Sequence, residues 1–244
     1  MNESGVRVWG ETHRGQVRPE NQDRFLIRKI RTGYILAVAD GVGGNGGGAI
    51  AARAVISAVR DFDFSGTDLE RELRLALGKG EKKIREKSAG QPDLAGMGTT
   101  LTLAAVTEGP VRWIHVGDTR LYRLSGGKLT QVTTDHTFIQ DLIDDGVLSP
   151  EQAGKHPLRN VLERCVGMDG TQPDSGRFHA GKDDGLLLCS DGLTRHLSNR
   201  EIASCLEKGL AAGSGAKALV KELMAAALAG GGEDNITVVL YLAG

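Results

Sequence analysis

Short apolar runs recur along the chain, and their composition predicts β-strands. Each run is rich in Val, Ile, Leu and Thr and is bounded by Gly, Asp or Pro, the pattern of strands that end in tight turns. The predicted strands cover residues 6–11, 24–30, 34–39, 99–106, 111–116, 120–124, 185–189 and 236–242. Gly126 and Gly127 lie between two such runs and predict a two-residue hairpin turn.

Helices are predicted where apolar residues recur three and four positions apart. Three long segments have this spacing: residues 49–60, 68–87 and 215–229. Ser149 and Ser198 are each followed three positions later by Gln or Glu, which is the capping-box pattern of a helix start. One more short helix is predicted over residues 135–145. Because strands and helices do not alternate strictly, their order favours mostly antiparallel sheet with helices packed outside.

Composition and charge narrow the class of protein. The 244 residues are enough to bury a substantial core. Lys and Arg number 30 and Asp and Glu 31, so the net charge of −1 provides no basic field for nucleic acid or an anionic membrane. No apolar stretch is long enough to span a bilayer, and the first residues lack an apolar signal core. We therefore predict a cytoplasmic protein with a single domain over residues 1–244, no nucleic-acid partner and no membrane insertion.

The cysteines do not indicate a disulfide framework or a zinc site. Cys165, Cys189 and Cys205 are odd in number and widely spaced. We expect each of them to be reduced and packed inside the protein.

Glycine is abundant, with 35 residues in short clusters beside apolar runs. Such clusters indicate turns where another group approaches the backbone closely. Residues 41–46 satisfy the GxGxxG pattern of dinucleotide-binding folds, after a predicted strand and before a predicted helix. Three features weaken that interpretation: Asp40 would repel a pyrophosphate, the glycine-rich stretch makes a chance match easy, and repeated βαβ units are missing.

Acidic residues stand at the ends of the apolar runs. Asp40, Asp118 and Asp191 follow three of the runs, while Asp23 and Asp234 precede two others. Any one of them could be a simple turn residue, because Asp beside Gly or Asn is common in turns. Several carboxylates that converge from strand ends, however, repel one another unless a cation neutralises them. Oxygen ligands favour Mg²⁺ or Mn²⁺, so the pattern predicts a site for one of these ions.

Six motifs in order resemble those of the metal-dependent serine/threonine protein phosphatases of type 2C (the PPM family). They are GQVRPENQDRF, LAVADGVGG, GMGTTLTLA, VGDTRLYRL, LLLCSDGLTRHLS and GGEDNITVVL, and HPLRNVLERCVG is similar to the bacterial branch. The resemblance covers nearly the whole chain. It implies an α+β fold, a four-layer α-β-β-α sandwich of two antiparallel sheets flanked by helices. It also implies hydrolysis of phosphoserine and phosphothreonine on proteins, in opposition to a bacterial Ser/Thr protein kinase.

The same resemblance implies a ligand set for two Mn²⁺ or Mg²⁺ ions. Asp40 would bridge the two ions, Asp191 and Asp234 would complete the shell of one, and the Gly41 carbonyl would bind the other. A water between the ions would attack phosphorus directly. Asp118 and Asp191 would hold a weaker third ion.

Further roles carry over to the N-terminal segment. Arg18 would bind the substrate phosphate, and Asp23 would hold metal-bound water. Gln22 departs from the family, which usually has Glu at that position. An amide oxygen can still accept a hydrogen bond but adds no charge, so we expect the second ion to be held loosely. The alternative is that Gln22 faces away and only Asp23 points inward.

Val42 is a second departure, because many eukaryotic members have His there as a candidate acid for the leaving group. His13, His136 and His156 lie in loop-like segments, where surface or structural roles are expected. Residues 135–165 correspond to the family's flap. Two interpretations of it stay open: a mobile lid that contacts substrate, or a helical cap that only packs.

Two other functions remain as alternatives. The departures at Gln22 and Val42 are compatible with a catalytically weak module that recognises phosphoproteins. The glycine-rich loop leaves a nucleotide-binding oxidoreductase as the third hypothesis.

Overall fold

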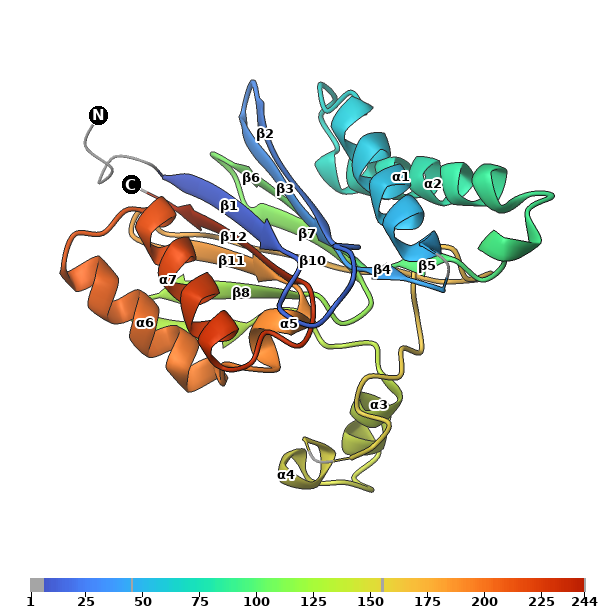
Figure 1. Ribbon diagram of the computed structural model, residues 1–244. Coiled ribbons are helices and arrows are strands. Elements are labelled where there is room, and N and C mark those ends of the chain that lie inside the picture. Colours follow the sequence, from blue (N-terminus) through green and yellow to red (C-terminus); the bar gives the residue numbers. More distant parts are fainter. Residues whose placement is uncertain (1–6, 45, 155, 244) are drawn as a thin grey trace.

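Two antiparallel sheets pack face to face at the centre of the molecule (Figure 1). The structure, a computed structural model, describes residues 7–44, 46–154 and 156–243. Val6 of the first predicted strand and Asn45 of the glycine-rich loop lie outside these residues. No helix in the described ranges has both the length and the apolar character that crossing a membrane requires.

Each of the two large sheets has five strands. The first has the order β1 (Val8–His13), β12 (Ile236–Leu242), β11 (Gly185–Cys189), β8 (Arg120–Ser125) and β9 (Lys128–Gln131). The second has the order β10 (Asp174–Phe178), β7 (Val111–Val116), β6 (Leu101–Thr107), β3 (Gly33–Ala39) and β2 (Arg24–Ile30). A short ribbon of β4 (Gly41–Val42) and β5 (Gly98–Thr99) extends from the second sheet toward helix α1.

Helices cover both outer faces of the sandwich. On the second sheet lie α1 (Gly47–Asp61) and α2 (Leu69–Ser88), and on the first lie α6 (Asn199–Ala211) and α7 (Ala216–Ala229) (Figure 1). The described residues also form the short helices α3 (Phe138–Asp144), α4 (Pro150–Ala153) and α5 (Asp191–Thr194). A 3-10 turn, η2, covers Pro92–Leu94.

Alternation along the strands explains the layers. In β3, Leu36 and Val38 pack between the two sheets, whereas Ile35 and Ala37 pack against the helical side. Successive side chains of a strand point to opposite faces, so a strand covered on both faces is apolar at every position. This arrangement confirms the predicted four-layer α-β-β-α sandwich.

The predicted elements agree with the structure except at their ends and in a few further places. Strands β4 and β10 and the short helix α5 were not predicted, and the predicted strand 99–106 is divided between β5 and β6. Ser198 and Glu201 form the expected capping box, but the helix predicted over residues 135–145 begins only after the Thr137 cap. Strand β10 was not predicted because it is short and polar. It pairs with β7 at the sheet edge, where Gly176 lies so close to the indole of Trp113 that a Cβ there would be 2.6 Å from the ring.

Residues 135–165 form an insert that projects from one end of the sandwich and carries α3 and α4 (Figure 1). Its two ends are joined, because Phe138 N–H donates to the Val161 carbonyl at 3.0 Å and Glu163 N–H donates to the His136 carbonyl at 2.9 Å. The cysteines are free: Cys165 and Cys189 are buried as expected, but Cys205 is only half-buried. Its position on the partly covered face of α6 explains that difference.

Candidate metal centre

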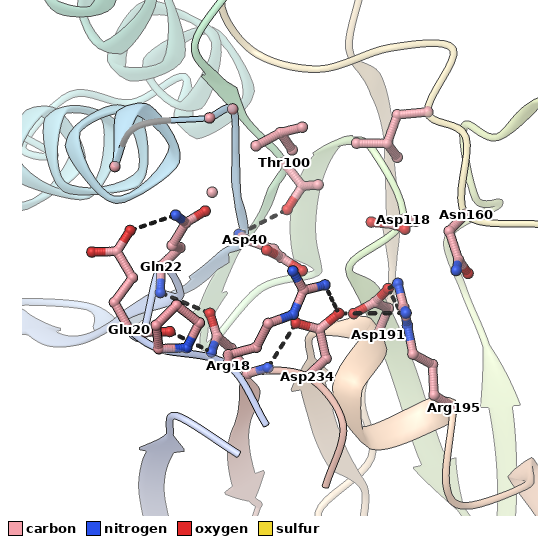
Figure 2. A pocket seen from close by; sticks show the side chains of 18 residues that line it. Arg18, Glu20, Gln22, Asp40, Thr100, Asp118, Asn160, Asp191, Arg195 and Asp234 are labelled. Atoms are coloured by element: carbon pink, nitrogen blue, oxygen red, sulfur yellow. Dashed lines mark hydrogen bonds and ion pairs between the residues drawn. The ribbon is translucent and has the colours of Figure 1, made fainter. Parts of the chain in front are cut away.

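A polar cavity of about 430 Å³ lies where strands of both sheets end, and four aspartates line it (Figure 2). They are Asp40, Asp118, Asp191 and Asp234. The sheets bring together residues from both ends of the chain, because β1 pairs with β12 and both lead into the site.

The backbone fixes Asp40 at the end of β3. Its N–H donates to Thr100 Oγ1 at 2.9 Å, and its carbonyl accepts from Thr100 N–H and from Thr99 Oγ1, each at 2.8 Å. These bonds leave the carboxylate to point into the cavity (Figure 2).

Gly41 is placed where only glycine fits. A Cβ at this position would overlap the carbonyl group of Gly48 at the start of α1 and would be 2.9 Å from the Gln22 carbonyl oxygen. Gly41 also lines the cavity. The tight turn therefore has a packing reason of its own, besides leaving the backbone accessible.

Two arginines bind the carboxylates of Asp191 and Asp234 (Figure 2). Arg18 donates from Nη2 to Asp234 Oδ2 at 2.7 Å. Arg195 donates from Nε to Asp191 Oδ2 at 2.7 Å, contacts the same oxygen with Nη2, and lies 3.4 Å from Asp234 Oδ2 through Nη1. Both carboxylates are well covered, with side chains 13% exposed.

Asp23 lies beneath the cavity and is fully buried. Its Oδ2 accepts from Ser190 Oγ and from Thr237 Oγ1, each at 2.7 Å. Burial raises the pKa of this carboxyl to about 6, against the opposing effect of the two hydroxyl donors. Asp23 is thus held next to the strand that ends in Asp191, rather than in the wall of the cavity.

The carboxylates repel one another. Burial, followed by the charges of Asp23 and Asp191, raises the pKa of Asp40 well above its usual value. Burial and the charge of Asp191 also raise the pKa of Asp118. A bound cation would relieve this repulsion, since it favours the charged form of every carboxyl near it.

The donor set fits a hard divalent ion. Buried Asp191 Oδ1 and Asp23 Oδ1 have no hydrogen-bond partner, and the ligand atoms available in the cavity are carboxylate and carbonyl oxygens, which suit Mg²⁺ and Mn²⁺. In the described residues no three His, Cys, Asp or Glu side chains are already closed around one point. Arg18 and Arg195 occupy Oδ2 of Asp234 and Asp191 instead.

Gln22 lines the cavity and does not face away from it. Its Nε2 donates to Glu20 Oε1 at 2.6 Å, and Glu20 lines the same cavity. A carboxylate therefore lies beside the position where the family usually has Glu, although it comes from two residues earlier.

Asn235 fastens the N-terminal segment to the site. Its Oδ1 accepts from Gln22 N–H at 2.7 Å, and its Nδ2 donates to the carbonyls of Arg14 and Glu20 at 2.8 and 2.9 Å. Asn235 is buried, so these bonds are shielded from water. They hold the loop that carries Arg18 against Asp234.

The sequence interpretation missed Arg195, Glu20 and the fastening role of Asn235. Arg195 had a readable signal, because it follows Asp191 by four residues and so shares its face of a helix. Glu20 had no such sequence signal, since its role depends on a contact with Gln22 within a loop.

The three histidines have structural roles. His136 is buried and its Nδ1 accepts from Gly117 N–H at 3.1 Å. His13 Nδ1 and His156 Nδ1 accept from backbone N–H groups two residues further on. Among these residues none lines the cavity of the four aspartates.

This fold and this site define a class. The sequence profile described as "Protein phosphatase 2C" matches residues 9–229, and the chain belongs to that family. Two of its relatives are bacterial proteins. "Serine/threonine protein phosphatase PstP" of Mycobacterium tuberculosis is 38% identical over 237 residues, which cover 96% of this chain but 44% of the relative. "Serine/threonine phosphatase stp" of Listeria welshimeri is 33% identical, with 94% and 92% covered.

A solved structure agrees with the architecture and with the chemistry of the donor set. The "catalytic domain of serine threonine protein phosphatase PstP in complex with 2 Manganese ions" superposes with a TM-score of 0.84 at 36% identity, covering 97% of each chain. This chain spans less than half the length of the PstP relative.

Proposed function

We propose that this protein is a Mn²⁺- or Mg²⁺-dependent phosphatase that hydrolyses phosphoserine and phosphothreonine on proteins. The observation that carries the proposal is the convergence of Asp40, Asp191 and Asp234 with Arg18 in one cavity. The PstP relative, named as a Ser/Thr protein phosphatase, supports the substrate class. We propose further that a cognate Ser/Thr kinase supplies the phosphoproteins.

Asp40, Asp191 and Asp234 would hold two ions, together with the Gly41 carbonyl. When bound, these ions would lower the pKa of a water and neutralise charge on the phosphoryl group. Asp118 and Asp191 would hold a weaker third ion. No side chain of the protein needs to act as nucleophile. Buried Cys189, at the end of β11, does not line the cavity and packs in the apolar cluster with α6 and α7.

The protein's own residues bind and orient the substrate. Arg18 lies at the mouth of the cavity with its side chain 52% exposed, so its guanidinium can reach an incoming phosphate by two parallel hydrogen bonds. Asp23 accepts hydrogen bonds from below and keeps one carboxylate oxygen unpaired. In this proposal that oxygen would orient a water held by the ions. Val42 has no proton to give, so the leaving alkoxide would take its proton from water or from another group in the site.

Release of phosphate from a phosphothreonine peptide tests the function. We expect release with Mn²⁺, loss of all activity in excess chelator, and recovery when Mn²⁺ or Mg²⁺ is added back. Full activity after verified metal removal would contradict the two-ion mechanism. Tight binding of the peptide without turnover would favour the alternative, a weak module that only recognises phosphoproteins. Binding of a nicotinamide cofactor would revive the oxidoreductase hypothesis.

Arg18→Ala is expected to raise KM by about tenfold, with a smaller loss of kcat. The reason is the loss of a charge-assisted bond to the phosphate, worth about 1.5–3 kcal/mol. Arg18→Lys should rescue poorly, because an ammonium cannot form two parallel bonds. Steady-state kinetics at saturating Mn²⁺ give both constants, and unchanged kinetics would make Arg18 a surface residue.

Gln22→Glu is expected to shift the metal-activation curve to lower concentration by about tenfold, with little change in the saturated kcat. It adds a charge to the cavity next to Glu20, and changes beside metal ligands alter affinity by about 10- to 100-fold. Glu20→Gln is the matched control and should shift the curve the other way. Coincident Mn²⁺ titrations of wild type and Gln22→Glu would remove Gln22 from the site.

A further inference from the structure

Arg195 is a charged residue in the site for which the family motifs predicted no role. It follows the short helix α5, and its side chain is 26% exposed. It lines the cavity of the four aspartates and also a neighbouring cavity of about 660 Å³ beneath the insert that carries α3 and α4.

The Arg195 guanidinium shares an acceptor with Arg18. Both contact Asp234 Oδ2, Arg18 at 2.7 Å and Arg195 at 3.4 Å. Figure 2 shows the two side chains approaching the aspartates from opposite sides. The two guanidinium groups therefore face the same point in the cavity.

The proposed ions would compete with Arg195 for carboxylate oxygens. Asp191 has a free oxygen, Oδ1, but both oxygens of Asp234 already have partners: Oδ1 accepts from Asn235 N–H at 2.9 Å, and Oδ2 contacts the two arginines. An ion held by Asp234 would therefore weaken the contact of Asp234 with Arg195. The guanidinium, which is always charged, would then bind another anion beside the ions.

We infer that Arg195 is a second phosphate-binding residue, which binds the substrate phosphoryl group from the side opposite Arg18. The inference rests on the proposed function. A phosphoryl group offers three outer oxygens, so two guanidinium groups and the ions can bind it together. Arg195 thus has two successive acceptors: the aspartates when metal is absent, and the phosphate when metal is bound.

Because of this exchange, Arg195 has opposite effects on the binding of metal and on the binding of phosphate. As a partner of Asp191 and Asp234 it competes with metal. As a phosphate ligand it strengthens binding of substrate and product. If Arg195 only stabilised α5, its replacement would weaken the binding of both metal and phosphate.

The test is Arg195→Gln, which keeps much of the side-chain stem and removes the charge. Calorimetric titration with Mn²⁺ should show metal binding strengthened about tenfold. At saturating Mn²⁺, titration with inorganic phosphate should show affinity weakened about tenfold or more. KM should rise by a similar factor both for p-nitrophenyl phosphate and for a phosphothreonine peptide. Arg200→Gln, an exposed residue in α6 outside the cavity, is the matched control and should change none of these values.

Other outcomes overturn the inference. Unchanged phosphate affinity would remove Arg195 from the phosphate, and weaker binding of both metal and phosphate would make it a structural residue of α5. If KM rose for an acidic phosphopeptide but not for p-nitrophenyl phosphate, Arg195 would bind an acidic residue beside the phosphorylated one and not the phosphate. Because the two titrations need no turnover, they test Arg195 even if the wild-type protein releases no phosphate, a result that would instead contradict the proposed function.

Discussion

Asp40→Asn is expected to lower kcat/KM by about 10³-fold or more. Asp40 is the carboxylate that would bridge the two ions, and the loss of its charge weakens the binding of both. The substitution is nearly isosteric, and the backbone bonds to Thr99 and Thr100 do not involve the side chain. The lost activity would therefore report the charge and not the fold.

Thermal unfolding without metal distinguishes a loss of charge at Asp40 from a loss of the fold. Neighbouring carboxylates and burial already disfavour the charged form of Asp40, so the Asn variant should have an equal or higher Tm when metal is absent. Added Mn²⁺ should raise the Tm of wild type more than that of the variant. Asp61→Asn, at the exposed end of α1, is the control and should retain full activity. Near-normal kcat/KM in Asp40→Asn would end the bridging assignment.

Asp118→Ala is expected to lower kcat by about 10²-fold while the protein keeps its fold and its two core ions. Asp118 faces Asp191 from the loop after β7, and the proposed third ion would lie between them. Removing one charged group that stabilises a transition state costs about 10²- to 10³-fold. Steady-state kinetics over a wide range of Mn²⁺ should show that high metal does not restore the rate.

Calorimetric titration with Mn²⁺ distinguishes Asp118 from the core ligands. We expect Asp118→Ala to bind its two core ions with the affinity of the wild type and Asp40→Asn to bind them more weakly. Asp183→Ala, which replaces an exposed aspartate before β11, is the control for loss of a surface charge. Normal turnover in Asp118→Ala, or loss of the core ions, would contradict the assignment.

The sequence was most informative where a residue's surroundings are local. Strands 24–30, 111–116, 185–189 and 236–242 have the bounds that the sequence predicted. The signal is strongest in strand 185–189, which is buried at every position and apolar throughout, because sheet covers one of its faces and helices the other. Strand β10 lacks that signal. It lies at the sheet edge, where Gly176 pairs with Trp113 of β7, and its polar sequence is like that of a loop.

In the candidate site too, residues with a local sequence signal were predicted and long-range contacts were not. The acidic residues were predicted from their places at strand ends, and the structure brings Asp40, Asp118, Asp191 and Asp234 into one cavity. The contacts of Asn235 with Arg14 and Glu20 join residues more than 200 positions apart, and no local pattern encodes them. Arg195 lies between these cases, because its spacing from Asp191 is local but its contact with Asp234 is not.

The pairing of β1 with β12 has a consequence for biosynthesis. The segment that carries Arg18 and Glu20 is held against Asp234 by residues that come late in the sequence: Asn235 bonds to the Glu20 carbonyl, and Gln16 donates to the carbonyls of Leu228 and Gly232. On the ribosome, the earlier strands of the sandwich can pair while residues 234–242 are still in the exit tunnel, but the N-terminal segment then has no partner for docking. Because contacts between residues so far apart in sequence form slowly, the cavity that carries Arg18 is completed only after β12 has emerged, later than the pairing of the earlier strands.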